Sequence, residues 1–300
     1  MKKEKIGVLS TAFSYFLWGI LPVYWKWLQH VGADEILANR VFWSFWFMIL
    51  YLFLSNRWNG FRKIIQEFRE NRRMLYALGI ASILISMNWF IYIFAVNSNQ
   101  MVEASLGYYI NPLVSVLLGV FILKEKLNKF HLVSFLLALT GVLILTISYG
   151  SFPWIAFGLA FSFGLYGLAK KVIKVNAAIG LTLETLIIVP IAFLYMLYLG
   201  VSGESFFISD SFGTTLLLVG AGAVTAIPLL LFGKGAQSIP LYMVGFLQYI
   251  APTITLLLGV IVYKEKFTQI DFIAFLFIWS ALMVFTVSRL KWFSVQTERA

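Results

Sequence analysis

Long apolar runs alternate with short polar breaks along the whole chain. Each run reaches about 20 residues, which is the length that an α-helix needs to cross the hydrocarbon core of a bilayer. Apolar residues are continuous within the runs, whereas the strands of a membrane β-barrel would alternate with a period of two. The pattern therefore predicts an all-α membrane protein. Its ten transmembrane helices are expected at residues 6–28, 35–55, 74–96, 102–123, 130–148, 153–173, 177–199, 213–234, 240–263 and 269–288.

The lysines and arginines indicate how these helices are oriented. If the N-terminus is cytoplasmic, every one of the 23 basic residues except Lys26, Arg40, Lys264 and Lys266 falls on the cytoplasmic side. Cytoplasmic loops of membrane proteins carry such an excess of Lys and Arg. We therefore expect a multi-pass protein of the bacterial inner membrane with both termini in the cytoplasm. The polar stretch 57–73 is expected to form a short amphipathic helix on the membrane surface.

Composition supports the membrane assignment and excludes other classes. Hydrophobic residues make up 61% of the chain and charged residues 12%, which is about half the charged fraction of a soluble domain. The net charge of +10 follows the topology and favours contact with anionic lipids, so we expect no nucleic-acid partner. The chain has no cysteine, and its two histidines, His30 and His131, fall at separate predicted helix ends. We therefore expect neither a metal site nor a cofactor.

One segment of the chain recurs 140 residues later. The sequence YINP at 109–112, with LLGV and KEK after it, returns as YIAP at 249–252, again followed by LLGV and KEK at the same spacing. A second pair is AFSYFLWG at 12–19 and AFSFGLYG at 160–167. Apolar helices often look alike, but a shared spacing of Pro, Gly and KEK indicates an internal duplication.

Each copy of the duplication holds five predicted helices. Because five is odd, the second copy enters the membrane from the opposite side. This inversion explains why Lys264 and Lys266 break the charge pattern, since they correspond to Lys124 and Lys126. We expect two inverted five-helix repeats, residues 1–150 and 151–300. Such repeats around a site at the membrane midplane are typical of secondary transporters.

Several stretches carry a resemblance to a known family. They are ADEILANR at 33–40, NW at 88–89, EASLGYYINP at 103–112, AFSF at 160–163, QYIAP at 248–252 and YKEK at 263–266. In these stretches, which span nearly the whole chain, the sequence resembles the RarD family of EamA-type permeases, in the drug/metabolite transporter (DMT) superfamily. The resemblance implies the ten-helix EamA/DMT fold with a central cavity. Where members usually have His-Arg, this chain has Asn39-Arg40, and Asn cannot relay protons by titrating near neutral pH.

Three ionisable side chains inside predicted helices are candidates for the solute site, because such groups are costly in lipid unless they pair or face water. Arg40 and Glu103 lie on the outer side, so we expect them to pair, either in the cavity or as a structural link between helices. Glu184 lies in the inner third of its helix, opposite Asn39 when the repeats are aligned. It is either a carboxylate for substrate or protons, or charge balance for nearby lysines.

Two prolines at equivalent points of the repeats mark the second group of candidates. Pro112 and Pro252 each remove a helical hydrogen bond, which frees a carbonyl that neighbours or a cavity must satisfy. The predicted kinks could serve packing, a pocket, or both. The polar and aromatic residues beside them are Tyr109, Asn111, Gln248 and Tyr249.

Aromatic residues near polar ones complete the predicted cavity. Asn88, Trp89 and Tyr92 share one helix face, and Trp18 and Tyr166 are equivalent in the repeats. Since aromatic residues make up 18% of the chain, many of them are expected at the membrane interface instead. The expected cavity residues are Trp18, Asn39, Arg40, Asn88, Trp89, Tyr92, Glu103, Tyr109, Asn111, Tyr166, Glu184, Gln248 and Tyr249.

These features predict a secondary transporter that moves a small amphiphilic metabolite or drug-like solute by alternating access. Arg40 would favour a carboxylate on the solute, and Glu184 an amine. The coupling ion, a proton or another, and the choice between monomer and homodimer are left open. An ATP-driven pump would need a P-loop, and a membrane enzyme would need a metal cluster or a catalytic pairing that the sequence lacks, so we expect no enzyme. A membrane enzyme of another kind, a passive channel or a scaffold is the alternative.

Overall fold

The computed structural model describes residues 2–67, 72–97, 100–173, 175–264 and 267–297. Glu265 and Lys266 of the second KEK triplet lie outside the described residues, as do the basic residues Arg69, Lys174 and Arg299.

Helices account for nearly all of the described residues, and no strand occurs among them. Ten helical segments in that part of the chain are long and apolar enough to span a membrane, which confirms the predicted all-α architecture. The helices are α1 (Lys2–Trp27), α2 (Ala33–Leu54), α3 (Trp58–Glu67), α4 (Arg72–Asn97), α5 (Met101–Phe121), α6 (Lys129–Tyr149), α7 (Trp154–Val172), α8 (Ala177–Ser202), α9 (Phe206–Ser209), α10 (Phe212–Ala236), α11 (Leu241–Gln248), α12 (Ile250–Leu257) and α13 (Gln269–Thr297). The short helix α3 lies within the stretch expected to be amphipathic.

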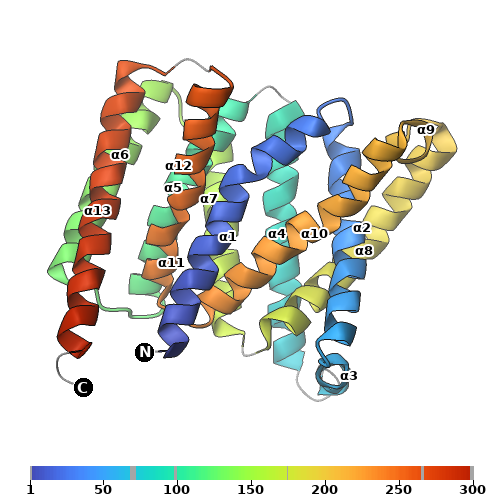
Figure 1. The fold of residues 1–300 in the computed structure, drawn as a ribbon, viewed down its shortest axis with the longest axis horizontal. Coiled ribbons are helices and arrows are strands. Elements are labelled where there is room, and N and C mark those ends of the chain that lie inside the picture. Colours follow the sequence, from blue (N-terminus) through green and yellow to red (C-terminus); the bar gives the residue numbers. More distant parts are fainter. Residues whose placement is uncertain (1, 68–71, 98–99, 174, 265–266, 298–300) are drawn as a thin grey trace.

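The helices form a bundle with two distinct ends (Figure 1). Both chain ends and α3 lie at one end, which we call the terminal end. The α1–α2 and α12–α13 connections lie at the other, which we call the far end. Helices α6 and α13 pack side by side at one edge of the bundle, and α2 packs against α8 at the other edge.

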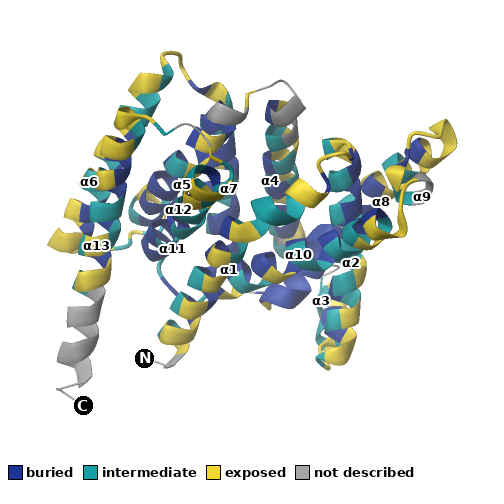
Figure 2. Ribbon diagram, turned by 45° about the horizontal axis from the view of Figure 1, so that its top comes forward, coloured by how far each residue is buried: buried dark blue, intermediate teal, exposed yellow. Residues whose placement is uncertain are grey.

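Burial follows the logic of a protein surrounded by lipid. Most residues of α5 and α11 are buried in the centre, whereas α6 and α13 carry many exposed residues (Figure 2). The exposed side chains include large apolar ones such as Leu9, Ile147 and Val201. These groups would be unfavourable in water but are suited to contact with acyl chains.

Small residues bring the central helices close together. A Cβ atom added at Gly245 of α11 would lie 2.7 Å from the carbonyl oxygen of Pro112 on α5. Any larger residue would push the two helices apart, which is the role that small residues have in packed membrane helices.

The two equivalent proline segments differ in shape. Helix α5 continues through Pro112, whereas the segment around Pro252 is divided at Tyr249 into α11 and α12 and then continues as a π-helical turn, Leu258–Val262. The kinks expected at Pro112 and Pro252 stay predictions. The two segments also bond to each other: the Tyr249 hydroxyl donates to the Tyr109 carbonyl, and the Tyr109 hydroxyl donates to the Pro252 carbonyl, both at 3.3 Å.

Candidate functional site

A central cavity of about 1140 Å³ lies between the helices. It is lined mainly by aromatic and apolar residues, with a few polar groups among them, which is typical of a small-molecule site. Among the residues predicted from sequence, the structure brings these into the lining: Trp18, Arg40, Asn88, Trp89, Tyr92, Tyr109, Asn111, Gln248 and Pro252. It places these outside the lining: Asn39, Glu103, Pro112, Tyr166, Glu184 and Tyr249.

The lining extends toward the far end of the bundle only. The lining there includes Lys26, near the end of α1, and Gln29, two residues beyond that end. Tyr263 and Asp271 also line the cavity at the far end. At the opposite limit the lining stops near Tyr15, in the middle of α1. The cavity therefore reaches one face of the bundle, and packed helices separate it from the terminal end.

Arg40 lies in the cavity wall, deeper along the helices than Lys26. Its Nε donates to the Thr225 hydroxyl of α10 at 3.0 Å. Its guanidinium carbon lies 4.7 Å from the ring centre of Trp25 and 5.8 Å from that of Trp89. Cation–π contacts of this kind stabilise a desolvated charge without neutralising it. Among the described residues Arg40 has no carboxylate within ion-pair distance, so its charge is available to a solute.

Polar atoms without a protein partner also belong to cavity-lining residues. Three buried atoms form no hydrogen bond with the described residues: the Tyr15 hydroxyl, the Asn111 amide oxygen and the Gln248 amide oxygen. A buried polar group without a partner costs about 1–3 kcal/mol. Each of these atoms is covered by neighbouring groups, so a solute would reach it only if those groups moved.

Aromatic rings shape the inner part of the cavity. The Trp18 ring packs edge-on against Phe163 at 5.7 Å and lies 5.4 Å from Tyr15. Asn88 of α4 is held in place because its amide nitrogen donates to the Ser162 hydroxyl of α7 at 2.9 Å and to the Leu159 carbonyl at 3.0 Å. The polar lining is therefore rigid where α4 meets α7.

Glu103 differs from the expectation. It forms no ion pair with Arg40; its carboxylate accepts from the Tyr149 hydroxyl at 3.0 Å and from the backbone N–H of Ile155 at 2.7 Å. The Ile155 N–H belongs to the first turn of α7, whose unpaired N–H groups attract a carboxylate. Glu103 thus caps a neighbouring helix.

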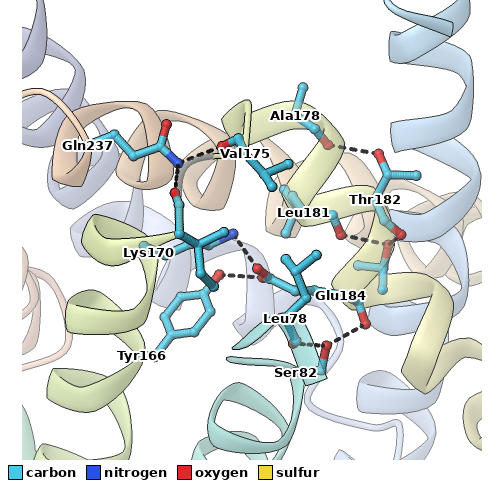
Figure 3. A network of polar contacts seen from close by, with 12 residues as sticks. Leu78, Ser82, Tyr166, Lys170, Val175, Ala178, Leu181, Thr182, Glu184 and Gln237 are labelled. Atoms are coloured by element: carbon cyan, nitrogen blue, oxygen red, sulfur yellow. Dashed lines mark hydrogen bonds and ion pairs between the residues drawn. The ribbon is translucent and has the colours of Figure 1, made fainter. Parts of the chain in front are cut away.

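Glu184 lies in a closed network instead of the cavity (Figure 3). Its carboxylate accepts from the Lys170 ammonium at 2.7 Å and from the Tyr166 hydroxyl at 3.0 Å. The Lys170 and Glu184 side chains are 3% and 2% exposed, so water cannot stabilise either charge alone. The backbone carbonyl of Glu184 accepts from Ser82 of α4 at 3.4 Å. The arrangement corresponds to charge balance, the alternative in which Glu184 does not face the solute.

The remaining residues outside the lining have structural contacts. Asn39 is fully buried, and its amide nitrogen donates to the Glu35 carbonyl within the same helix at 3.0 Å. Tyr166 is turned toward Glu184, and Tyr249 toward the Tyr109 carbonyl. The repeat equivalence of Tyr166 and Trp18 therefore does not bring both rings to the cavity.

Sequence reasoning missed several lining residues. Trp25 and Thr225 hold Arg40, and Tyr108 lines the cavity beside Tyr109. Lys26 lies at the far end, with its ammonium 3.9 Å from the ring centre of Tyr263. Thr225 could have been suspected as a polar residue in an apolar span, but nothing in the sequence places it opposite Arg40.

Polar contacts join the helices at the terminal end. Glu125, in the α5–α6 connection, accepts from the backbone N–H groups of Leu241 at 2.7 Å and Tyr242 at 2.9 Å, at the start of α11. The Lys171 ammonium lies 4.0 Å from Glu125 and donates to the Ile239 carbonyl. We call Glu125, Lys171 and the start of α11 the terminal clamp. It joins the two sequence halves on the side that the cavity does not reach.

Comparison with known proteins identifies the family. Residues 5–147 match the model of the EamA-like transporter family. The chain is 53% identical to the uncharacterized transporter YojE of Bacillus subtilis, over 97% of this chain and 96% of that protein. It is 41% identical to protein RarD of Escherichia coli, over 95% of each. A solved crystal structure with 20% identity has the same fold, with a TM-score of 0.70 over 95% of this chain and 98% of that one. This chain therefore belongs to the RarD family of EamA-like transporters, within the drug/metabolite transporter superfamily.

Proposed function

We propose that this protein is a secondary transporter that carries a small amphiphilic solute by alternating access of the central cavity. Its family makes it a membrane transporter rather than an enzyme, and its ten membrane-capable helices and bacterial relatives make it a multi-pass protein of the bacterial inner membrane. The observation that carries the proposal is a cavity that reaches one face of the bundle and holds Arg40, a cation without a described carboxylate partner, among aromatic rings.

The charges around the cavity favour an anionic or zwitterionic solute. Among the described lining residues, Arg40 and Lys26 face one carboxylate, Asp271. Asp271 already accepts from the Thr268 hydroxyl at 2.7 Å and the Thr268 backbone N–H at 3.0 Å. Glu184 cannot counter an amine as expected from sequence, because Lys170 neutralises it. Arg40 would instead bind a carboxylate or a similar oxyanion, and the rings would bind the apolar body.

Alternating access needs one closed and one open side. In the state described here the terminal clamp closes one side. Tight packing adds to it, since a Cβ added at Gly7 of α1 would lie 2.7 Å from the Ile239 side chain. Release of the clamp and closure of the far end would expose the same cavity to the other side of the membrane.

The division into inverted repeats, residues 1–150 and 151–300, is part of the same proposal. Two observations support it. Lys124 and Lys264, equivalent in the sequence repeat, both have a φ of 57°, a left-handed conformation that is uncommon for a residue with a side chain. The Tyr249 hydroxyl also donates to the carbonyl of its sequence equivalent, Tyr109. From the lysine and arginine distribution we propose that the terminal end is cytoplasmic.

The test is a solute screen followed by transport. Purified protein in nanodiscs is screened by thermal shift against a metabolite panel that includes carboxylates, amines and neutral amphiphiles. Compounds that bind are then assayed in proteoliposomes for saturable uptake and for stimulation by the same solute on the opposite side. Transport predicts both properties for an oxyanion-bearing amphiphile. Flux that neither saturates nor responds to solute on the other side would indicate a passive channel and overturn the proposal.

A further inference from the structure

A second cavity, of about 650 Å³, lies at the terminal end and is separate from the solute cavity. The first turns of α1 and the end of α2 meet the start of α8 and the last turns of α10 there. We call it the basic pocket. Its lining residues are Lys3, Ile6, Tyr51, Arg57, Asn176, Ala177, Leu230, Leu231, Lys234, Gln237 and Ser238.

Its charges all have one sign. Lys3, Arg57 and Lys234 line the pocket, and neither Asp nor Glu is among the described lining residues. None of the three cations forms an ion pair with a described carboxylate. Arg57 is fixed in position, because its guanidinium donates to the Asn176 amide oxygen at 3.0 Å. Three cations that converge on one hollow repel each other unless an anion lies between them.

A helix N-terminus adds to the positive potential. The N-cap of α8 is Asn176, whose side chain accepts from the Ala178 N–H at 3.0 Å, and both Asn176 and Ala177 line the pocket. The backbone dipoles of a 26-residue helix place a partial positive charge at this end, and anions bind favourably there.

The walls of the pocket are partly apolar. Ile6, Leu230 and Leu231 line it beside the cations, and Ile6 is 39% exposed. A free inorganic anion would leave this apolar surface uncovered. A ligand with an anionic head and an acyl chain would contact both parts of the pocket.

We propose that the basic pocket binds the phosphate headgroup of an anionic phospholipid from the leaflet at the terminal end. The bound lipid bridges α1 and α2 of the first half to α8 and α10 of the second half. The proposal does not depend on the transport function, since the pocket and the solute cavity share no lining residue.

The test compares charge inside and outside the pocket. Lys234→Gln removes an exposed pocket cation that makes no described ion pair, and Lys3→Gln combined with Lys234→Gln removes two. Lys129→Gln is the matched control, because Lys129 is an exposed lysine at the start of α6 and does not line the pocket. Each protein is placed in phosphatidylcholine nanodiscs with and without phosphatidylglycerol. Lipids that stay bound are counted by native mass spectrometry, and the Tm is recorded for each composition.

We expect the wild type and Lys129→Gln to retain phosphatidylglycerol and to show a higher Tm in its presence. Each pocket cation removed should weaken retention by roughly fivefold. Equal losses in Lys129→Gln would indicate diffuse surface charge and overturn the proposal. Retention that is unchanged in the double variant would also overturn it. A last arm adds inorganic phosphate to protein in phosphatidylcholine alone; a Tm increase equal to that from phosphatidylglycerol would assign the pocket to a free anion and contradict the lipid proposal.

Discussion

Arg40 and Glu184 are both single charges within membrane-spanning helices, yet their surroundings are opposite. Arg40 lies at the wall of a cavity, held by one hydroxyl and two aromatic rings, with no described carboxylate partner. Glu184 is enclosed by Lys170 and Tyr166 and has no access to the cavity. The sequence presents the two residues alike, as costly ionisable groups in apolar segments.

The difference shows how a charge in a membrane helix can be classified. A charge whose partners are all supplied by the protein stabilises one arrangement of helices. A charge that the protein holds only by neutral groups, without a counter-charge, is available to a solute. Substitutions at the two sites should therefore separate folding from binding.

The largest effect is expected for Glu184→Ala. Removal of the carboxylate would leave the Lys170 ammonium buried without a counter-charge, and breaking such a pair costs about 3–5 kcal/mol. We expect a large decrease in Tm and in the yield of folded protein, measured by fluorescence-detected size-exclusion chromatography of heated samples.

The double variant Lys170→Met with Glu184→Leu provides the control. It removes both charges, so most of the lost stability should return. A double variant as unstable as Glu184→Ala would show that the pair itself is not the cause. A Glu184→Ala protein with wild-type stability and no transport would instead make Glu184 a functional carboxylate.

The second effect is expected for Arg40→Gln. The variant should fold with a Tm near that of the wild type, because Arg40 forms one hydroxyl bond and no described ion pair. Its affinity for an oxyanion-bearing solute should decrease by roughly ten- to a hundredfold, the value of one or two charge-assisted hydrogen bonds. Isothermal titration calorimetry in nanodiscs measures the affinity. Unchanged affinity together with a strongly reduced Tm would give Arg40 a structural role.

A third, smaller effect is expected at the terminal clamp. Glu125→Gln keeps one acceptor oxygen for the α11 N–H groups but removes the charge that attracts them and Lys171. The closed state at the terminal end should lose roughly 1–2 kcal/mol, which shifts the population between the two states by about tenfold. Spin labels across the clamp would report this shift as a second distance in pulsed electron spectroscopy. A single, unchanged distance would exclude Glu125 as a determinant of closure.

The smallest effect concerns pH and the α9–α10 connection. The Thr214 hydroxyl, the Ser211 backbone and His30 hold the pKa of Asp210 below its ordinary value of 3.8. The stabilisation from Asp210 is therefore present at pH values above 3.8 and is lost as the pH falls through the lower pKa of the folded state. In Asp210→Asn this contribution is absent, so the Tm of the variant should fall less than that of the wild type as the pH is lowered from 7 to below 3.8. Identical Tm profiles for variant and wild type would show that these contacts do not stabilise the fold.

The number and approximate bounds of the membrane-spanning helices could be predicted from the sequence, because each apolar run must be long enough to cross the bilayer. The cavity could be predicted only in part. Asn88, Tyr109 and Gln248 lie in its lining, as their polar or aromatic character in apolar helices indicated. Charge balance by a nearby lysine was one of the two alternatives for Glu184, and Lys170 is that lysine, but the sequence does not decide between the alternatives. The Ile155 partner of Glu103 could not be predicted, since it approaches through helix packing that no local pattern records.

The sequence also did not predict that one of the two proline-containing segments is divided into two helices. Pro112 and Pro252 both follow a Tyr-Ile pair one residue earlier, yet α5 continues through its proline whereas the second segment is divided into α11 and α12. The contacts of Arg40 with Thr225 and Trp25 could not be predicted either. They form only where α1, α2 and α10 meet in the folded protein.

Access to the cavity is the most direct test of the central claim. Because the chain has no cysteine, Ala251→Cys gives a single thiol in the cavity lining. If the cavity opens only toward the far end, a membrane-impermeant thiol reagent should label this cysteine from the far side, and bound solute should slow the labelling. With Glu125→Gln added, labelling from the terminal side should increase while labelling from the far side decreases. Equal labelling from both sides at the same time, in protein with an intact clamp, would describe an open channel and contradict alternating access.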